Sequence, residues 1–496
     1  MNHTLGIDVS TTATKAVVID NDGAVVATGS TEYGYETPRA LWSEQSPDLW
    51  TEATTAAIRT AVASAGLSGD AIAAVGLTGQ MHGLVLLDAS DRPLRPAILW
   101  NDQRTQVECD EIRSRVGKAR LVQITGNDAL TGFTASKVLW VRNHEPELFS
   151  MARSILLPKD FVRLFLTGDH ATDRAGGSGT QLFDLAARSW STEILDLLDL
   201  DPALLPPAFE GTSVTGHITS PAAEATGLRA GTPVVAGGGD QAANAIGTGV
   251  IDPGSIALSL GTSGVVFAAT DRPDFEPEGR VHAFCHAAPD RWHMMGVMLS
   301  AAGSLRWFRD TLAPGVSFDE LVAEANAVAA GADGLLFLPY LTGERTPHPD
   351  PLARGAFIGL TIRHSRAHLT RAVLEGVAFG LRDALDLMHA AGLGETGEIR
   401  GSGGGTRSAL WRQILADVLE ADLVAVNTAE GAAYGAGVLA AVGAGWFPTA
   451  GAAADTWVTI TDRTPPGTTD YSAPHQLYAE QYELLRSTFA RLSAGA

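Results

Sequence analysis

Two similar segments, half a chain apart, constrain the fold of this sequence more than any other feature. They are LGIDVSTTATKAVVI (5–19) and IALSLGTSGVVFA (256–268). Each has a short apolar run, a cluster of Gly, Ser and Thr, and then a β-branched apolar run, a pattern typical of two strands joined by a tight turn. Because the turn residues are small, their backbone N–H groups stay free to bind an anion. We therefore expect two similar domains, each presenting a phosphate-binding hairpin.

The rest of the sequence alternates between strand-like and helix-like segments, which predicts an α/β fold. Strands are expected at 74–78, 84–87, 97–100, 233–236 and 334–338, and helices at 47–65, 159–166, 241–247, 367–390, 408–419 and 476–492. The turn at 251–254 suggests a boundary between domains 1–248 and 249–496. The uncharged run 431–454 has few large apolar residues, so we expect one tightly packed helix rather than a membrane span.

Composition excludes several partner classes. The chain has 35 Lys and Arg against 56 Asp and Glu, a net charge of −21. Such a uniformly acidic protein is a poor binder of nucleic acid or of an anionic membrane surface. Its two cysteines exclude a disulfide scaffold, and the start of the sequence shows no signal peptide. We therefore expect a cytoplasmic protein.

The first hairpin carries candidate metal and phosphate ligands. Asp8 ends its first strand, where a carboxylate can hold Mg²⁺ against nucleotide phosphates, although it could instead cap its own turn. Thr11 and Thr12 can donate hydrogen bonds to phosphate, and Lys15 can neutralise developing charge. In the second hairpin, Gly261 and Thr262 occupy the corresponding turn.

Asp240 is the candidate general base. It follows three glycines at the end of the strand 233–236, and glycines allow a substrate to approach the backbone closely. A carboxylate at this position can accept a hydroxyl proton during phosphoryl transfer. The structural alternative is an N-cap for the helix that begins at Gln241, and the two roles can coexist.

Two further glycine-flanked clusters are candidate binding sites. Gly404 and Gly405, followed by Ser408, form a Gly-rich loop at a helix start that favours an anion or a flat base. In the segment 79–83, Gln80 and His82 could bond sugar hydroxyls, although a lone histidine is more often structural. His282 and His286 flank Cys285, but the segment alternates like a strand, so packing is favoured over metal binding.

Taken in order, these segments resemble carbohydrate kinases of the FGGY family over nearly the whole chain. The family-wide matches are GIDVSTTATK (6–15), VVAGGGDQAANAIG (234–247), LSLGTSGV (258–265), FLPYLTGERTPH (337–348) and SGGGTRSALWRQILADV (402–418). Five other segments resemble specifically the members that phosphorylate D-xylulose: LWSEQSPDLW (41–50), GQMHG (79–83), RPAILWNDQR (95–104), TGFTASKVLWV (131–141) and LLPKDFVRL (156–164).

The resemblance implies a two-domain, actin-like and ribonuclease-H-like ATPase fold with the active site in the interdomain cleft. It implies transfer of the ATP γ-phosphate to the 5-hydroxyl of D-xylulose with Mg²⁺, in a possible homodimer. The roles it assigns are Asp240 as general base, Asp8 as a second essential acid near the metal, Met81, His82 and Gln241 as sugar contacts, Thr262 as a phosphate ligand, and Gly404 and Gly405 as the lining of the nucleotide base.

Two departures from the family pattern leave alternatives open. Ser10 stands where the family usually has glycine, which would cost stability if the turn required a positive φ. Gln241 leaves the sugar specificity undetermined. A kinase for ribulose, a pentitol or glycerol therefore remains an alternative, although Met81 and His82 argue against glycerol. Another class is an actin-like ATP-binding chaperone or a sugar-sensing regulator. A chaperone needs no alcohol-facing base such as Asp240, and a sugar-sensing repressor is expected to carry a basic DNA-binding module before the first phosphate strand, which starts here at Leu5.

Overall fold

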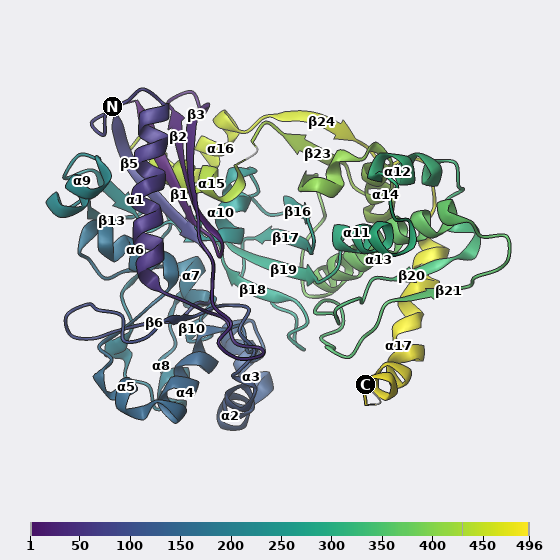
Figure 1. Cartoon of the computed structure of the whole chain (residues 1–496), viewed down its shortest axis with the longest axis horizontal. Coiled ribbons are helices and arrows are strands. Elements are labelled where there is room, and N and C mark those ends of the chain that lie inside the picture. The colour runs from purple at the N-terminus through teal and green to yellow at the C-terminus, as the bar shows by residue number, and fades with distance from the viewer. Residues whose placement is uncertain (1, 429, 495–496) are drawn as a thin grey trace.

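Two seven-stranded mixed sheets organise the molecule (Figure 1). The computed structural model describes residues 2–428 and 430–494. The first sheet has the order β13-β14-β5-β1-β2-β3, with β15 also paired to β5, and the second has the order β18-β19-β17-β16-β22-β23-β24. Their strands are β1 (His3–Val9), β2 (Ala13–Asp20), β3 (Val25–Glu32), β5 (Ile72–Gly79), β13 (Val214–His217), β14 (Pro233–Val235) and β15 (Gly238–Gly239), then β16 (Ile256–Leu260), β17 (Gly264–Thr270), β18 (His282–Cys285), β19 (Trp292–Met298), β22 (Ile399–Ser402), β23 (Leu423–Val426) and β24 (Ile460–Thr464).

The predicted hairpins are present, one in each sheet. Strands β1 and β2 pair antiparallel up to Val9 opposite Thr14, and β16 and β17 pair up to Leu260 opposite Gly264. The first strand of each hairpin also pairs in parallel with a later strand, β1 with β5 and β16 with β22. The two halves therefore share one local topology, and the predicted two-part α/β fold is confirmed.

Helices cover both sheets and fill the space around them. They are α1 (Pro47–Ser64), α2 (Gln106–Val116), α3 (Lys118–Thr125), α4 (Thr134–His144), α5 (Pro146–Met151), α6 (Pro158–Thr167), α7 (Arg174–Ser178), α8 (Thr192–Leu197), α9 (Ser220–Thr226), α10 (Asp240–Gly247), α11 (Ala302–Leu312), α12 (Phe318–Asn326), α13 (Arg366–Ala390), α14 (Ala409–Leu419), α15 (Gly431–Gly443), α16 (Ala450–Trp457) and α17 (Ser472–Ala494). Short two-strand pairings add β4 (Glu44–Gln45), β6 (Val85–Leu87), β7 (Ala97–Ile98), β8 (Ser154–Leu156), β9 (Thr172–Asp173), β10 (Phe183–Asp184), β11 (Ser189–Trp190), β12 (Ala208–Phe209), β20 (Leu336–Leu338) and β21 (Ala356–Ile358). All six predicted helices appear within a few residues of their expected bounds.

The prediction of one helix over 431–454 is wrong. The run forms two helices, α15 and α16, and Pro448 lies in the connection between them. Gly445 has a φ of 78° just after α15, a left-handed conformation that ends helices, and a proline soon afterwards cannot continue one. None of the helices in 2–428 and 430–494 combines the length and hydropathy needed to cross a bilayer.

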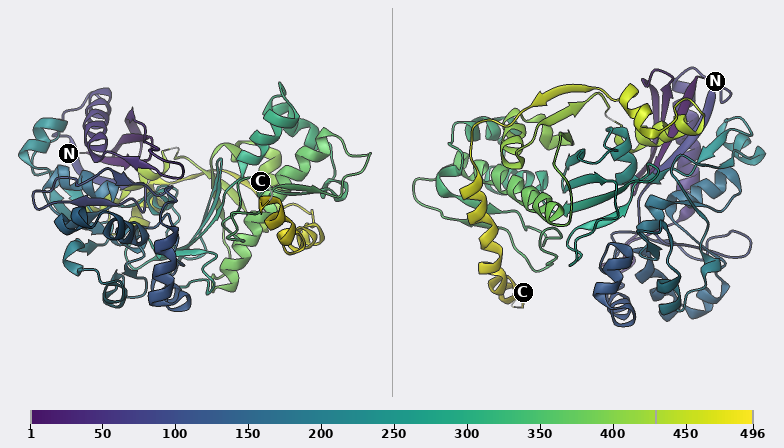
Figure 2. Two further views of the ribbon diagram at one scale, coloured as in Figure 1. Left: turned by 60° about the horizontal axis from the view of Figure 1, so that its bottom comes forward. Right: turned by 180° about the vertical axis from the view of Figure 1, so that it is seen from behind.

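Helix α15 packs against the first sheet, although it comes from the second half of the chain (Figures 1 and 2). A Cβ on Gly6 would lie 1.9 Å from the Ala433 carbonyl oxygen, and one on Gly435 would lie 1.8 Å from that of Ala243. Only small residues allow backbones to come this close, which explains the run of Ala and Gly. The predicted boundary at residue 248 stays a prediction, and α15 shows that chain from beyond it completes the core of the first sheet.

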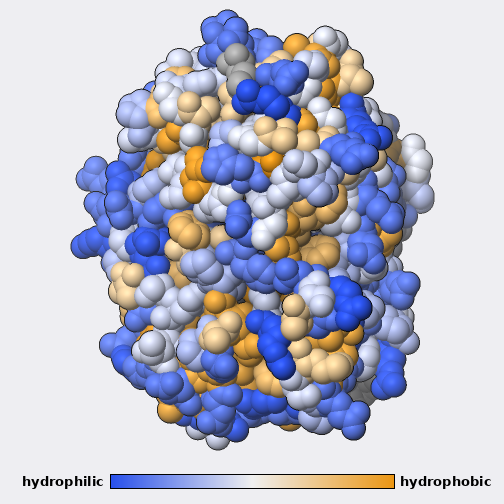
Figure 3. All heavy atoms as spheres, turned by 90° about the vertical axis from the view of Figure 1, so that its left-hand side faces the viewer, coloured by the Kyte–Doolittle hydropathy of each residue, from blue (hydrophilic) through white to orange (hydrophobic). Residues whose placement is uncertain are grey.

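The outer face of the N-terminal half mixes hydrophilic side chains with smaller hydrophobic areas (Figure 3). Its core lies inside, between the sheet and the helices α1 and α6.

Replacing Gly435 with alanine tests the close packing of α15. Alanine favours an isolated helix over glycine, but here its Cβ would overlap the backbone of α10. We expect Gly435→Ala to lower the free energy of unfolding by about 1–3 kcal/mol in urea denaturation. A Cβ on Gly394 would meet no atom within 4 Å, so Gly394→Ala is the matched control and should change stability by less than about 0.5 kcal/mol. Equal stability of the two variants would contradict the packing.

Candidate active site

Asp8 and Asp240 lie at the same edge of the first sheet. Asp8 on β1 is in register with Thr78 of β5, and Gly238 of β15 is in register with Thr78 from the other side. All three strands run parallel, so Asp8 and the residue that follows β15, Asp240, both lie at their carboxyl ends. A Cβ on Gly237 would lie 1.7 Å from the Leu77 carbonyl oxygen, and its φ is 79°. This glycine therefore makes the bend that places Asp240 there.

Burial raises the pKa values of both carboxyls. The pKa of Asp8 rises to about 7 because the group is desolvated and because the charge of Asp240 opposes its ionisation, with a smaller opposite effect from Lys15. The pKa of Asp240 rises to about 6 through burial, although hydrogen bonds from the backbone and side chain of Gln241 favour its charged form. A carboxyl with a pKa near neutrality can take up and release a proton under physiological conditions.

Asp8 does not cap its own turn, and Asp240 takes part in the start of α10 only by accepting from the Gln241 N–H at 2.8 Å. Ser10 fastens the first turn, because its N–H and its hydroxyl both donate to the Ala13 carbonyl, at 3.0 and 2.8 Å. Asp8 Oδ1 is buried and has no hydrogen-bond partner among the described residues. Helix α10 begins at Asp240 itself, with Gly239 as its N-cap. Ser10 is not among the described residues with positive φ, so the departure from glycine causes no strain.

The other residues of the first hairpin are held by protein partners. Thr11 donates to Gln80 Oε1 at 3.3 Å and accepts from the indole N–H of Trp100 at 3.0 Å. Lys15 forms a 2.8 Å ion pair with Glu430, which directly precedes α15. The side chain of Thr12 is exposed. The phosphate roles of Thr11, Thr12 and Lys15 stay predictions.

Met81 and His82 lie beside the glycines that precede Asp240. A Cβ on Gly239 would lie 2.8 Å from Met81 Cγ, and His82 Nδ1 is 2.6 Å from the Gly179 carbonyl oxygen. Burial lowers the pKa of His82 to about 3, so the ring is neutral. Because a carbonyl only accepts, Nδ1 carries the proton and Nε2 is left as an acceptor.

Gln80 differs from this pair. Its side chain is buried, donates to Gln45 Oε1 at 3.3 Å and accepts from Thr11. The structure therefore places Gln80 in a network that supports the first turn, and its contact with a sugar stays a prediction.

The sequence analysis missed the residues that support this loop. Lys137 is fully buried and donates to the carbonyls of His82 and Gly132, at 2.8 and 2.7 Å. Phe133 packs edge-on against His82, with ring centroids 4.8 Å apart. Trp100 was assigned to a strand, but it lies in a turn and remains 43% exposed beside Thr11. Their segments, 95–104 and 131–141, were matched to the family, but no individual role was predicted for them, because their partners are distant in the sequence.

A cavity of about 750 Å³ opens beside the second hairpin. It brings together five predicted nucleotide residues: Gly261, Thr262, Gly404, Gly405 and Ser408. A Cβ on Gly404 would meet nothing within 4 Å, whereas one on Gly405 would lie 2.4 Å from Leu260 Cδ2. The Ser408 hydroxyl accepts from the Trp411 N–H at 3.2 Å and so caps α14.

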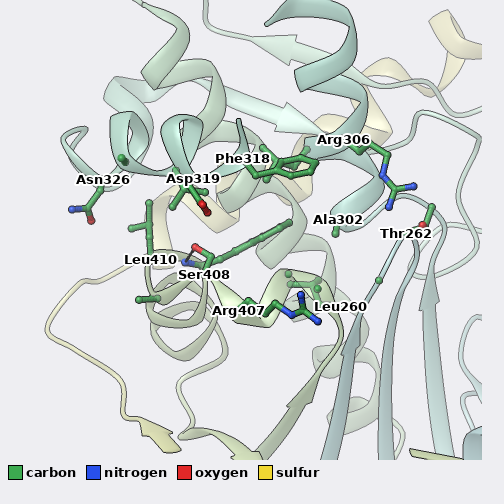
Figure 4. A pocket seen from close by; sticks show the side chains of 18 residues that line it. Leu260, Thr262, Ala302, Arg306, Phe318, Asp319, Asn326, Arg407, Ser408 and Leu410 are labelled. Atoms are coloured by element: carbon green, nitrogen blue, oxygen red, sulfur yellow. Dashed lines mark hydrogen bonds between the residues drawn. The ribbon is translucent and has the colours of Figure 1, made fainter. Parts of the chain in front are cut away.

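The opposite wall of this cavity was not predicted. It comes from α11 and α12, with Arg306, Phe318 and Asn326 among the lining residues. Figure 4 shows Arg306 reaching toward Thr262 at one end and Asn326 at the other. Since these helices carry no Gly-rich motif, only the folded arrangement identifies them.

His282 and His286 have protein partners, as the packing interpretation predicted. His282 Nδ1 lies 2.8 Å from Asn127 Oδ1, and His286 Nε2 lies 3.0 Å from the Val250 carbonyl oxygen. Both lie on or directly after the edge strand β18, and both are buried. His282 therefore belongs to the packing between the two halves, and His286 to the packing within the second half.

The fold is that of a two-domain α/β carbohydrate kinase. The family model described as "FGGY family of carbohydrate kinases, N-terminal domain" matches residues 3–247, and the corresponding C-terminal domain matches residues 256–444. The chain belongs to the FGGY family of carbohydrate kinases.

Several relatives are similar over most of their length. A xylulose kinase of Escherichia coli K12 is 46% identical over 415 residues, 84% of each chain, and one of Lactococcus lactis is 38% identical over 492 residues, 97% of each chain. Among solved structures, a ligand-bound xylulose kinase from Lactobacillus acidophilus has a TM-score of 0.94 at 27% identity, covering 99% of this chain and 100% of the other. A gluconate kinase from Lactobacillus acidophilus has a TM-score of 0.93, also at 27% identity, covering 99% of each chain.

The raised pKa of Asp240 predicts a pH-dependent stability. Its folded pKa, about 6, exceeds the ordinary value of 3.8, so the folded state holds a proton that the unfolded state releases. Stability from this group is present below about pH 4 and is lost as the pH rises through 6. In metal-free buffer, Asp240→Asn should exceed the wild type in free energy of unfolding by about 1–3 kcal/mol at pH 8, with the difference shrinking toward pH 4. A constant difference across this range would contradict a raised pKa.

Proposed function

We propose that this chain transfers the γ-phosphoryl group of ATP to the 5-hydroxyl of D-xylulose, with Asp240 as the general base. The observation that carries the proposal is the position of Asp240, at the carboxyl edge of the first sheet beside Met81 and His82. The similarity to xylulose kinases of 34–46% identity over most of the chain supports the sugar.

Asp240 assists the attack by accepting the hydroxyl proton. An alcohol is a weak nucleophile, and a base acts best when its pKa lies near the working pH. The pKa of about 6 leaves Asp240 charged at neutral pH and still able to accept a proton as the O–H bond weakens. The Gln241 side chain bonds the carboxylate and limits its orientation.

Asp8 fits a divalent metal, which a kinase uses to balance the charge of ATP. Its buried Oδ1 lacks a hydrogen-bond donor among the described residues, and oxygen ligands of this type suit Mg²⁺. When bound, Mg²⁺ would neutralise phosphate charge and stabilise the in-line displacement. A cation there would also relieve the repulsion between Asp8 and Asp240 that raises the pKa of Asp8.

In this proposal, each hairpin contacts a different part of the nucleotide. Thr262 and Gly261 lie at the cavity that fits the nucleotide, with Gly404 and Gly405 lining the place of the base. Thr11, Thr12 and Lys15 would face the phosphates from the first sheet. Charge that develops on the phosphoryl group would thus meet donors from both halves of the chain.

His82 would fix the orientation of the sugar. Its Nε2 can accept from a hydroxyl, and the alkyl part of Met81 offers an apolar contact beside it. A kinase for another sugar, a polyol or a sugar acid is the second candidate, because a gluconate kinase shares the fold almost as closely.

Sugar-dependent ADP release tests the proposal. We expect turnover with Mg²⁺-ATP to be strongest with D-xylulose, compared with D-ribulose, gluconate, glycerol and no sugar. Asp240→Asn should lower kcat by about 10²–10⁴-fold because proton transfer loses its acceptor. Asp48 occupies the first turn of α1, as Asp240 does in α10, and it is exposed, so Asp48→Asn should leave kcat unchanged.

Two results would contradict the proposal in different ways. Preference for another substrate would keep the kinase and change the sugar. ADP release that no sugar or polyol stimulates would contradict phosphoryl transfer to an alcohol altogether.

A further inference from the structure

The positively charged guanidinium of Arg345 has no protein partner among the described residues. Among residues 2–428 and 430–494, its guanidinium has neither a hydrogen-bond acceptor nor an ion pair, although the residue is half-buried. Other arginines with little exposure are paired. Arg104 bonds Asp102 and Glu44, and Arg188 bonds Glu210. A guanidinium that is partly desolvated and unpaired is costly unless a ligand supplies the missing acceptor.

The backbone around Arg345 is fixed against the strand that leads to the second hairpin. Glu344 Oε1 accepts from the N–H groups of Leu299 and Arg345, at 2.9 and 2.8 Å. Thr346 donates its N–H to the Val297 carbonyl at 3.0 Å. These contacts place Arg345 at the carboxyl end of β19.

That end of β19 adjoins the phosphate-type turn. Met298 is in register with Gly264, the first residue of β17. The N–H of Ala301 then donates to the Thr262 carbonyl at 2.9 Å. Arg345 is therefore anchored beside the hairpin that faces the nucleotide cavity.

The guanidinium also acts on the sugar side of the site. Its charge contributes to the low pKa values of His82 and His282, so it lies within Coulomb range of both rings. His82 is adjacent to Met81, which packs against Gly239 directly before Asp240. Arg345 thus lies near the second hairpin and within Coulomb range of the proposed sugar ligand.

We propose that Arg345 binds the phosphoryl group as it reaches the sugar oxygen and then holds the phosphate of the sugar-phosphate product. The two anions of the reaction are the nucleotide and this product, and the proximity of His82 favours the product. An arginine suits the task because its planar fork bonds phosphate in a bidentate manner. The identity of the sugar in this inference rests on the function proposed above. The inference that Arg345 binds a phosphate group does not depend on which sugar carries it.

A phosphate-binding role for Arg345 predicts different effects on the binding of D-xylulose and of D-xylulose 5-phosphate. D-xylulose carries no charge and gains nothing from a guanidinium that lacks a phosphate to bind. D-xylulose 5-phosphate does gain affinity from it. Replacing Arg345 should therefore weaken binding of the phosphate ester and leave binding of the free sugar unchanged. A merely structural arginine would affect both ligands alike.

Calorimetric titration of the intact protein with each ligand tests this distinction. We expect Arg345→Gln to weaken the binding of D-xylulose 5-phosphate by about tenfold or more, and the binding of D-xylulose by less than about twofold. Arg345→Lys, which keeps the charge but loses the fork, should lie between Arg345→Gln and the wild type. Arg363 is exposed and its side chain is unpaired within the described part of the chain, so Arg363→Gln is the matched control and should behave as the wild type.

The same experiment contains the results that would overturn the proposal. Arg345→Gln that binds the sugar phosphate within twofold of the wild type would do so, as would equal losses for the two ligands. In steady-state kinetics, an effect confined to the KM for ATP would assign the cation to the nucleotide instead.

Failure of the proposed sugar is distinguishable. If the wild type binds neither D-xylulose nor its phosphate, the sugar assignment fails and inorganic phosphate becomes the probe. Binding of inorganic phosphate that is lost in Arg345→Gln would still support the anion site, and equal binding by both would overturn it.

Discussion

The parallel register of β1, β5 and β15 is the constraint on which the site depends. It brings Asp8 and Asp240 to one sheet edge from positions more than two hundred residues apart. Burial there makes both carboxylates costly to ionise, which raises their pKa values toward neutrality. The same burial destabilises the protein, and in the function proposed here it prepares Asp240 to accept a proton and Asp8 to accept a cation. The two carboxylates that the proposed reaction uses are therefore also the groups whose burial lowers the stability of the protein.

Close packing of α15 connects this edge to the second half of the chain. The helix contacts β1, β5 and α10 through small residues, and Glu430 at its start pairs with Lys15 beside the first turn. The second half therefore contributes to the electrostatics of the first hairpin as well as to the nucleotide cavity. The two similar halves are thus joined by α15, which comes from the second half and completes the core of the first sheet.

Local pattern predicted much of the fold, because hairpins and helix ends are specified by neighbouring residues. Both hairpins, the α/β class and α1, α6 and α13 are examples. The split between α15 and α16 was missed because a run of Ala and Gly suggests tight packing without marking where a helix ends. The candidate site residues came from small-residue turns, at Asp8, Asp240 and Thr262; the structure brings Asp8 and Asp240 to one sheet edge and Thr262 to the cavity, and their roles stay predictions. No individual role was predicted for Lys137, Phe318 or Arg345, although Lys137 and Arg345 lie in segments that resemble the family. Their roles depend on groups far away in the sequence: a loop carbonyl, a cavity wall and a neutral histidine. Gln80 shows the converse limit, since its motif suggested a sugar and the fold provides it with protein partners.

Loss of activity in Asp240→Asn cannot separate a base from a nucleophile, since a carboxylate can also form an acyl phosphate. The stereochemistry at phosphorus can. ATP whose γ-phosphoryl group is chiral through oxygen isotopes would be turned over with the preferred sugar, and the configuration of the product would be determined. Our account, with direct in-line transfer and Asp240 accepting only a proton, predicts inversion. Retention would require two displacements through a phosphorylated side chain and would contradict the account.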